Sequence, residues 1–461
     1  MVQLVPLVQL PLYPLQPSNP LTLKIPQVTE AFLQYLWQHR LFDEPLTTVD
    51  GLSVEVLRPG LLNTDAGPDF MDVRLRIDGC LWAGSVEVHL RSSDWNRHHH
   101  TGDYAYNGVL LHVVYQHDAE IRLPDGSVLP TLEVREVIPE MVWHNYETLL
   151  SPPSEMAVGC AGRITQVPSV VRRAALDSLS VERMQRKTQV VARMLDESRG
   201  NWEQCCYLLL AHYFGGRVNA FPFELMAKSI DMNLLARWRD DTRRLEALLF
   251  GQAGMLQEFF EDEYPRQLQA DYQALRQGAG LKPISAHLWK FFRLRPSGFP
   301  TLRISQFAQL LGRSQSLFSR LLEMDRVEEL RDCFDVAASD YWTTHYRFDQ
   351  PSTARHKGVG RDFVDGLILN AWIPLLFEYG QRHDDDGCRQ QALDLLQQLP
   401  AEKNRVSRIW HSVSVDAENA AQSQALLQLY NEYCQQHRCL QCPLGYYVLT
   451  AADVADTSPS V

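Results

Sequence analysis

The pattern of hydrophobic and polar positions changes twice along the chain. Between residues 52 and 137 it is built of short segments in which apolar and polar residues alternate or apolar residues cluster. Alternation with a period of two predicts β-strands, and Asp78-Gly79 and Asp125-Gly126 are turn signals between them. The predicted strands are SVEVL (53–57), DVRLRI (72–77), SVEVHL (85–90), VLLHVVY (109–115), EIRL (120–123) and TLEV (131–134).

Helical spacing of apolar residues lies on both sides of this region. Residues 28–43 place apolar side chains on one stripe after Thr29, which can cap a first turn. From Val167 to Leu449 nearly every segment has helical periodicity, interrupted by short loops. We therefore expect an α+β chain, with an N-terminal helix and a mixed β-sheet in a domain over 28–150 and a large all-helical domain over 156–450.

Both ends of the chain have a different composition. Residues 1–27 contain six prolines and no positive charge before Lys24, which excludes a helix and is unlike a signal peptide. We interpret 1–27 as a proline-rich extended arm and 451–461 as a disordered tail.

Composition and charge exclude several classes of protein. The 461 residues are 45% hydrophobic and 22% charged, as in globular proteins, and the formal net charge is -12, which excludes a uniformly basic nucleic-acid coat. No apolar run is long enough to span a membrane, so we expect no membrane partner. Nine cysteines at low density do not form a secreted disulfide framework, which favours a cytoplasmic protein.

The stretch LNTDAGPDF…SVEVHL carries the clearest candidate chemistry. Asp69 precedes one predicted strand, and Glu87 and His89 lie on the next. Because residues i and i+2 of a strand share a face about 6.5–7 Å apart, Glu87 and His89 can address one point. Two carboxylates on adjacent strands suit Mg²⁺ or Mn²⁺, and a basic group beside them can orient or deprotonate an attacking water. We predict Asp69, Glu87 and His89 as catalytic residues.

This GPD…ExH arrangement resembles the PD-(D/E)xK nuclease superfamily, whose core runs helix, three strands, helix, strand. The resemblance implies a restriction-endonuclease-like core in which Asp69 and Glu87 match the motif carboxylates and His89 replaces the usual Lys. It also implies that Glu30 on the first helix joins Asp69 and Glu87 as a metal ligand. The implied activity is Mg²⁺- or Mn²⁺-dependent hydrolysis of phosphodiester bonds in DNA or RNA.

Three alternatives use the same residues. Glu87 and His89 can simply lie on the solvated face of an amphipathic strand. A non-catalytic nucleic-acid-binding or assembly protein can retain a degenerate nuclease core. A β-sandwich or cupin-like barrel can bind a small ligand, or Zn²⁺ or Fe²⁺ through Glu87 and imidazoles such as His100 and His112. Topology separates them, because the nuclease-like alternatives need a mixed sheet.

A second cluster of candidate ligands lies near the C-terminus. Cys434, Cys439 and Cys442 are close enough in the chain to bind one soft metal centre, which needs a fourth ligand. The nearby His437 and the distant Cys160 are the candidates. A cysteine far upstream joined to a C-terminal trio resembles the structural iron–sulfur site of some nuclease domains related to the RecB family, which implies Cys160. The expected cofactor is Zn²⁺ or an iron–sulfur cluster, and the alternative is a set of free thiols.

One window of the helical region is basic. Residues 272–322 contain no Asp or Glu, and aromatic residues alternate there with Arg and Lys. Such a surface can contact phosphates and stack on bases, although it can equally be a solvated basic face. We predict nucleic-acid binding by Lys290, Arg293, Arg295 and Arg303.

Taken as a whole, the chain resembles a bacterial family of uncharacterised proteins, the domain-of-unknown-function family numbered 2851, over roughly residues 28–450. The resemblance rests on segments such as TEAFLQYLW, LNTDAGPDF, LWAGSVEVHLRSSDW, HLWKFFRLRPSGFPTLRISQFA, DYWTTHYRFDQPS and LPAEKN. It implies kinship and no activity, so the residues themselves must indicate the function.

Overall fold

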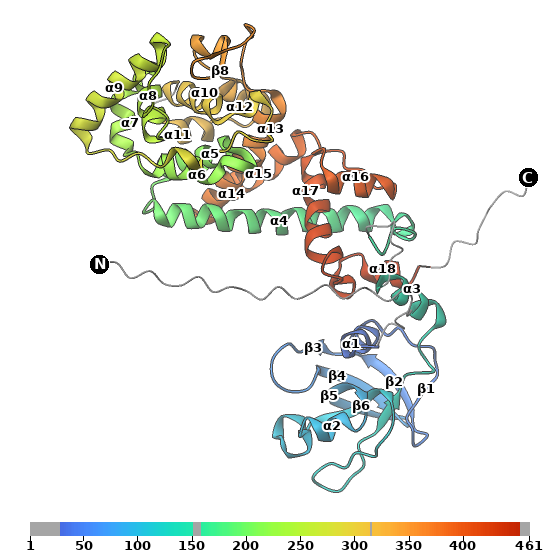
Figure 1. Ribbon diagram of the computed structural model, residues 1–461. Coiled ribbons are helices and arrows are strands. Elements are labelled where there is room, and N and C mark those ends of the chain that lie inside the picture. The colour runs from blue at the N-terminus through green and yellow to red at the C-terminus, as the bar shows by residue number, and fades with distance from the viewer. Residues whose placement is uncertain (1–27, 151–157, 314–315, 452–461) are drawn as a thin grey trace, which may run out of the picture. The chain divides into compact units, whose positions relative to one another are not determined.

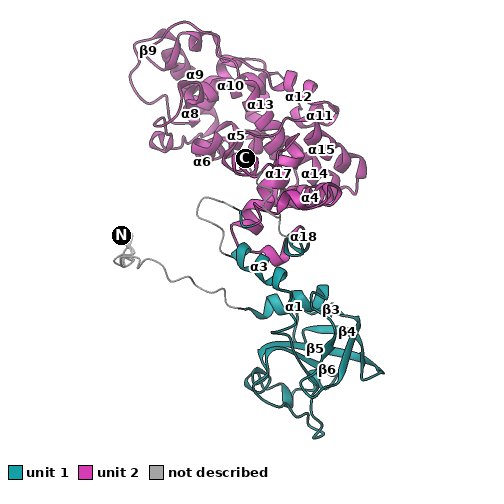
Figure 2. Cartoon of the chain, turned by 90° about the vertical axis from the view of Figure 1, so that its right-hand side faces the viewer, with its two compact units in different colours: residues 1–159, 445–461 teal, residues 160–444 magenta. Residues whose placement is uncertain are grey.

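A computed structural model describes residues 28–150, 158–313 and 316–451 (Figure 1). The predicted N-terminal arm and nearly all of the predicted tail lie outside these residues. The chain forms two compact units (Figure 2). Unit 1 contains the described residues up to Gly159 together with those from Gly445 onward, and unit 2 contains those between Cys160 and Leu444.

Unit 1 is built on one seven-stranded mixed sheet in the order β1-β2-β4-β5-β6-β7, with β3 paired to β4. Pairing is antiparallel as far as β5, and β5, β6 and β7 are parallel. The predicted α+β class is confirmed, and the sheet is not a β-sandwich. The strands are β1 (Leu46–Thr47), β2 (Ser53–Arg58), β3 (Leu61–Leu62), β4 (Phe70–Ile77), β5 (Cys80–Arg91), β6 (Val109–Gln116) and β7 (Thr131–Glu133).

Helix α1 (Glu30–His39) is part of unit 1 and buries its apolar stripe in the core of that unit. The side chain of Thr29 accepts the N–H of Phe32, which satisfies one of the free donors of the first turn. Phe32, Leu33 and Leu36 are fully buried, and Trp37 donates its indole N–H to the carbonyl of Pro59 at 2.9 Å. Gln34 of the same helix donates to the carboxylate of Asp69, the residue before β4.

A short crossover joins the parallel strands β5 and β6. It contains the single-turn helix α2 (Asp94–Arg97) and two 3-10 turns, His100–Gly102 and Tyr104–Tyr106. The two strands approach closely where β6 begins, because a Cβ on Gly84 would lie 2.5 Å from the carbonyl oxygen of Gly108. The predicted strand at 120–123 is wrong. Those residues precede a tight turn and make only a single antiparallel bridge, between Arg122 and Val128.

Unit 2 is a helical bundle around one large apolar core. Its centre is rich in aromatic residues, including Phe214, Phe223, Phe307, Trp342 and Trp372. Two π-helical segments, Ile368–Trp372 and Leu429–Cys434, interrupt it. The helices are α4 (Ser169–Glu197), α5 (Trp202–Phe214), α6 (Gly216–Lys228), α7 (Met232–Trp238), α8 (Thr242–Gln252), α9 (Glu263–Ala279), α10 (Pro300–Gly312), α11 (Leu317–Leu322), α12 (Val327–Phe334), α13 (Arg361–Leu367), α14 (Ile373–Arg382), α15 (Asp386–Gln398), α16 (Arg405–Ser412) and α17 (Ala420–Gln428).

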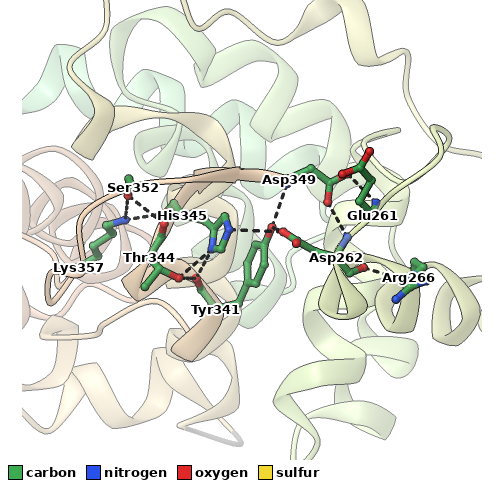
Figure 3. Close-up of polar contacts among 9 residues, drawn as sticks. All are labelled: Glu261, Asp262, Arg266, Tyr341, Thr344, His345, Asp349, Ser352 and Lys357. Atoms are coloured by element: carbon green, nitrogen blue, oxygen red, sulfur yellow. Dashed lines mark hydrogen bonds and ion pairs between the residues drawn. The ribbon is translucent and has the colours of Figure 1, made fainter.

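Unit 2 is not purely helical as predicted. The segment DYWTTHYRFDQPS forms a hairpin of β8 (His345–Arg347) and β9 (Gln350–Pro351). Side chains tie it to the start of α9 (Figure 3). The Asp349 carboxylate accepts the backbone N–H groups of Glu261 and Asp262, and Tyr341 donates to the Asp262 carboxylate at 2.6 Å. A hairpin this short has few hydrogen bonds between its own strands, and these side-chain bonds add to its stability. None of the helices in the described part of the chain is long and apolar enough to cross a membrane.

The C-terminal end of the described chain returns to unit 1. Helix α18 (Gly445–Leu449) packs on α3 (Glu140–Leu150). The amide N–H₂ of the fully buried Asn145 donates to the carbonyls of Leu449 at 2.7 Å and Ala451 at 3.0 Å. Unit 1 is therefore built from two segments that are distant in sequence.

We expect the Asn145→Ala substitution to destabilise unit 1 by roughly 1–3 kcal/mol, because two carbonyls lose their donor. Scanning calorimetry of the full chain measures the effect as a lowered melting transition. Thr148→Ala is the matched control, since Thr148 is half-buried and its hydroxyl donates to the carbonyl of His144 in its own helix. Equal melting temperatures of the two variants would show that the bonds from Asn145 to the C-terminal segment do not stabilise unit 1.

Candidate metal and catalytic site

The pairing of β4 with β5 brings Asp69 and Glu87 together. Phe70 pairs with Val86 in this antiparallel ladder. Asp69 precedes Phe70 and Glu87 follows Val86, so Asp69 and Glu87 lie opposite each other at the same end of the strand pair. The N–H of Asp69 donates to Glu87 Oε2 at 3.0 Å, and the N–H of Val88 donates to Asp69 Oδ2 at 2.9 Å. Each carboxylate is thus fixed by the backbone of the opposite strand.

These carboxylates are removed from water. The Glu87 residue is 5% exposed and His89 is 2% exposed, so the alternative of a solvated strand face is wrong. Burial raises the pKa of Asp69. Burial first, and then the negative charge of Asp69, raise the pKa of Glu87 to about 8. Two buried carboxylates that repel each other form a site whose charge a bound cation would neutralise.

Helix α1 contributes two groups to the same place. Gln34 donates its amide N–H to Asp69 Oδ1 at 2.9 Å. The carboxylate of Glu30 lies close enough that its charge raises the pKa of both Asp69 and Glu87. The structure therefore brings Glu30 to the predicted carboxylate pair. Gln34 was not predicted, although it lies one helical turn beyond Glu30, on the same face.

A row of imidazoles adjoins Glu87. His89 Nδ1 lies 2.9 Å from His112 Nε2, and His89 Nε2 lies 3.1 Å from His98 Nδ1. Glu87 Oε1 lies 3.4 Å from Nε2 of both His89 and His100. Ring nitrogens of His89, His98 and His100 all lie within 4.8 Å of one another. This convergence is tighter than the strand pattern alone predicts.

The buried imidazoles are neutral at pH 7. Burial first, and then the neighbouring imidazoles, lower the pKa of His89 to about 2 and that of His112 to about 3. Such a group is a poor acceptor for a proton from bulk solution. Neutral imidazole is, however, the form that binds metal ions or carries a proton along a hydrogen-bonded row.

Aromatic rings hold the histidine cluster in place. Tyr106 stacks on His100 with ring centroids 3.8 Å apart, and Trp95 packs edge-on against the same imidazole. Burial first, and then the charge of Glu87, raise the pKa of Tyr106 to about 12, so its hydroxyl stays protonated. Sequence reasoning did not select Tyr106 or Trp95, because both lie in the irregular crossover.

The donor set fits a divalent cation. Asp69, Glu87 and Glu30 provide carboxylate oxygens, which Mg²⁺ and Mn²⁺ prefer, while imidazole also suits Mn²⁺, Zn²⁺ and Fe²⁺. His100 Nε2 is buried and has no hydrogen-bond partner among the described residues. Glu87 touches both groups of ligands, so a cation at this place would contact Glu87 in either case.

The predicted nucleic-acid-binding residues fall into two environments in unit 2. Lys290, Arg293 and Arg295 are exposed in the loop before α10. Arg303 instead packs its guanidinium 3.5 Å from the ring centroid of Phe363 and donates to Gln306 at 2.9 Å. Burial lowers the pKa of Arg303 to about 10. Arg303 is therefore engaged inside unit 2, and the other three point to solvent.

The four predicted cysteine ligands all lie in unit 2. Burial first, and then the neighbouring cysteines, raise the pKa of Cys160 to about 12, and the pKa of Cys434 is raised for the same reasons. His437 has a left-handed backbone (φ 52) and is exposed. The role of these four cysteines as metal ligands stays a prediction.

Fold and site together define a chain with a carboxylate–imidazole site on a mixed α+β unit and a second, helical unit. The chain belongs to the family described as Protein of unknown function (DUF2851), whose model matches residues 30–405. No curated protein and no solved structure matches it. The family description names no activity, so the function has to be inferred from the site.

We expect the His98→Ala and His100→Ala substitutions to weaken the binding of a transition-metal ion about tenfold or more, because each removes a converging nitrogen. Titration with Co²⁺, followed by its visible absorption, measures the affinity. The matched control is His99→Ala, since His99 lies between them and is exposed. Equal affinity in all three variants would place the ion elsewhere.

Proposed function

We propose that the protein is a divalent-metal-dependent hydrolase of phosphodiester bonds in DNA or RNA, with Mg²⁺ or Mn²⁺ bound by Asp69, Glu87 and Glu30. The observation that carries the proposal is the buried Asp69–Glu87 pair, in which each carboxylate accepts a backbone N–H from the other strand. Such a pair is costly without a cation and is held rigidly enough to position one.

The order of elements supports this proposal. Helix α1 is followed by the antiparallel strands β2, β4 and β5, the single-turn helix α2, and the parallel strand β6. This is the order helix, three strands, helix, strand of the PD-(D/E)xK nucleases that the motif resembles. Asp69 precedes the second of these strands and Glu87 lies on the third, as the resemblance requires.

The residues of the site have different roles in this reaction. A bound cation would polarise a phosphoryl oxygen and lower the pKa of a water molecule. Gln34 and the N–H of Val88 hold the Asp69 carboxylate, and the N–H of Asp69 holds Glu87. The hydrogen-bonded imidazoles of His89 and His98 lead from buried Glu87 to the surface, and they offer a route for the proton that the attacking water loses.

A non-catalytic alternative is favoured by one observation. His89 stands where the resembling nucleases have Lys, and its pKa of about 2 leaves it uncharged. A protein with this substitution can bind nucleic acid without cleaving it. Binding without turnover in the presence of Mn²⁺ would favour this alternative.

The loop from Lys290 to Arg295 supports a nucleic-acid partner. Phe292 is 80% exposed, and the guanidinium of Arg293 lies 5.3 Å from the centroid of its ring. An exposed aromatic ring among cations can stack on a base while the cations contact phosphates. The chain elsewhere is acidic, with a net charge of -12, so this loop is a local exception.

We expect Glu87→Gln to reduce Mn²⁺-dependent cleavage of a labelled oligonucleotide on the order of a hundredfold or more, because it removes the shared anionic ligand. Glu55→Gln, an exposed substitution on β2 of the same sheet, should leave cleavage unchanged. Cleavage that is equal in both variants would rule out the Asp69–Glu87 site as the source of activity.

We also expect Phe292→Ala to weaken binding of single-stranded DNA by about 1–3 kcal/mol through loss of stacking. The double variant Arg293→Ala with Arg295→Ala should lower the slope of log K against log salt by about 1.4. Fluorescence anisotropy at several salt concentrations measures both effects. Arg408→Ala, another exposed arginine of unit 2, is the control, and an identical change in that variant would argue against the loop.

A further inference from the structure

The two oxygens of the Glu87 carboxylate face different groups. Oε2 accepts the N–H of Asp69 at 3.0 Å, whereas Oε1 lies 3.4 Å from Nε2 of His89 and 3.4 Å from Nε2 of His100. The proposed Mg²⁺ or Mn²⁺ ion uses the acidic side, with Asp69 and Glu30. The imidazoles on the Oε1 side are not ligands of that ion, so their convergence is a separate feature of unit 1.

The three-histidine cluster, formed by His89, His98 and His100, is spaced like the ligands of one small cation. His89 Nε2 lies 3.1 Å from His98 Nδ1, and one ring nitrogen from each of the three residues lies within 4.8 Å of the other two. Zinc binds imidazole at about 2.0–2.1 Å, so two ligand atoms of a tetrahedral zinc ion are about 3.4 Å apart. Small side-chain rotations therefore bring the three nitrogens onto one ion.

His100 is the member of the cluster whose ligand atom lacks a partner. Its Nε2 is buried and forms no hydrogen bond with the described residues. A buried nitrogen without a partner is unfavourable unless a ligand satisfies it. The residue is 9% exposed, and the ring of Tyr106 stacks on it with centroids 3.8 Å apart. The ring is thus held in place with a free ligand atom beside Glu87.

A fourth imidazole orients His89. Its Nδ1 lies 2.9 Å from Nε2 of the fully buried His112, on the opposite side of the ring from the nitrogen that faces His98. A metal-bound histidine commonly has its second ring nitrogen hydrogen-bonded, which fixes the tautomer and the orientation of the ring. His112 is therefore a positioning residue. His98 is exposed and leaves an ion a path from solvent.

We propose that the three-histidine cluster binds one zinc ion, and that Glu87 lies between this ion and the Mg²⁺ or Mn²⁺ ion of the proposed hydrolase. Three protein ligands with one open position are the pattern of zinc sites that hold a water molecule or a substrate. Neutral imidazole is the form that binds zinc, and burial lowers the pKa of both His89 and His100.

The zinc ion supplies a charge that the imidazoles lack. The nucleases that the motif resembles have a lysine at the position of His89, and neutral His89 cannot replace its charge. A zinc ion bound there restores a positive charge beside Glu87. His89 and His98 then bind the ion in place of each other, so a proton leaves through the zinc-bound water, whose pKa falls to about 7. This role rests on the proposed hydrolase, whereas the zinc site itself does not.

The test is metal analysis of the full chain. We expect about one zinc ion per chain, or uptake of one from added Zn²⁺, and Co²⁺ in its place should give the strong visible absorption of a four-coordinate ion. Excess Mg²⁺ should not remove it. A chain that takes up neither Zn²⁺ nor Co²⁺, or in which Zn²⁺ and Mn²⁺ displace each other at a single site, would overturn the proposal.

Two variants separate the ions. His98→Ala should lower the affinity for zinc about tenfold or more and leave Mn²⁺ binding, followed by electron paramagnetic resonance, unchanged. Asp69→Asn should have the reverse effect, because it removes a carboxylate ligand from the other side of Glu87. His99→Ala, a change of the exposed neighbour, should retain both ions. Loss of both ions in both variants, or full zinc binding by His98→Ala, would refute a separate zinc site.

A measurement on the unmodified chain needs no variant to fold. Zinc should protect His98 from modification by diethyl pyrocarbonate and leave His99, which is also exposed, reactive. Equal reactivity of His98 with and without zinc would contradict the assignment. None of these readouts involves nucleic acid, so a chain that binds zinc as described but cleaves no oligonucleotide would refute the hydrolase and support the zinc site.

Discussion

The antiparallel pairing of β4 with β5 is the interaction on which the site depends. It places the carboxylates of Asp69 and Glu87 side by side in a buried position and lets the backbone of each strand hold the carboxylate of the other. Without those two N–H donors, the desolvation and mutual repulsion of the pair would be uncompensated. The register of the pairing is irregular, since Asp72, with φ 56, is an extra residue on β4 between Phe70 and Val73. A bulge of this kind redirects the start of the strand, and here it sets Asp69 opposite Glu87.

The parallel neighbour β6 contributes an imidazole beside Glu87. His112 on β6 is the direct ladder partner of Glu87, and it meets His89 from across the strands. The crossover then folds His98 and His100 back over the sheet. The result is a carboxylate shared between an oxygen-rich side and an imidazole-rich side. Such a site suits cations that accept both kinds of ligand, of which Mn²⁺ is the common example.

Many buried polar groups of unit 2 have hydrogen-bond partners within the unit. Buried Glu246, for example, accepts hydrogen bonds from Tyr264 and Ser305, and the hairpin of Figure 3 is bonded to the start of α9.

The sequence alone determined the order and type of most elements and several members of the site. Period-two alternation gave the strands around Glu87 and His89, and the pairing of neighbouring strands brought Asp69 near them, because strand geometry is local. Only the tertiary structure decided that Glu87 and His89 are buried, that Gln34, His98 and Tyr106 join them, that Arg303 is packed under Phe363, and that α18 returns to α3. Burial, ladder register and contacts between distant segments depend on how the whole chain packs, and no local pattern of residues contains that information.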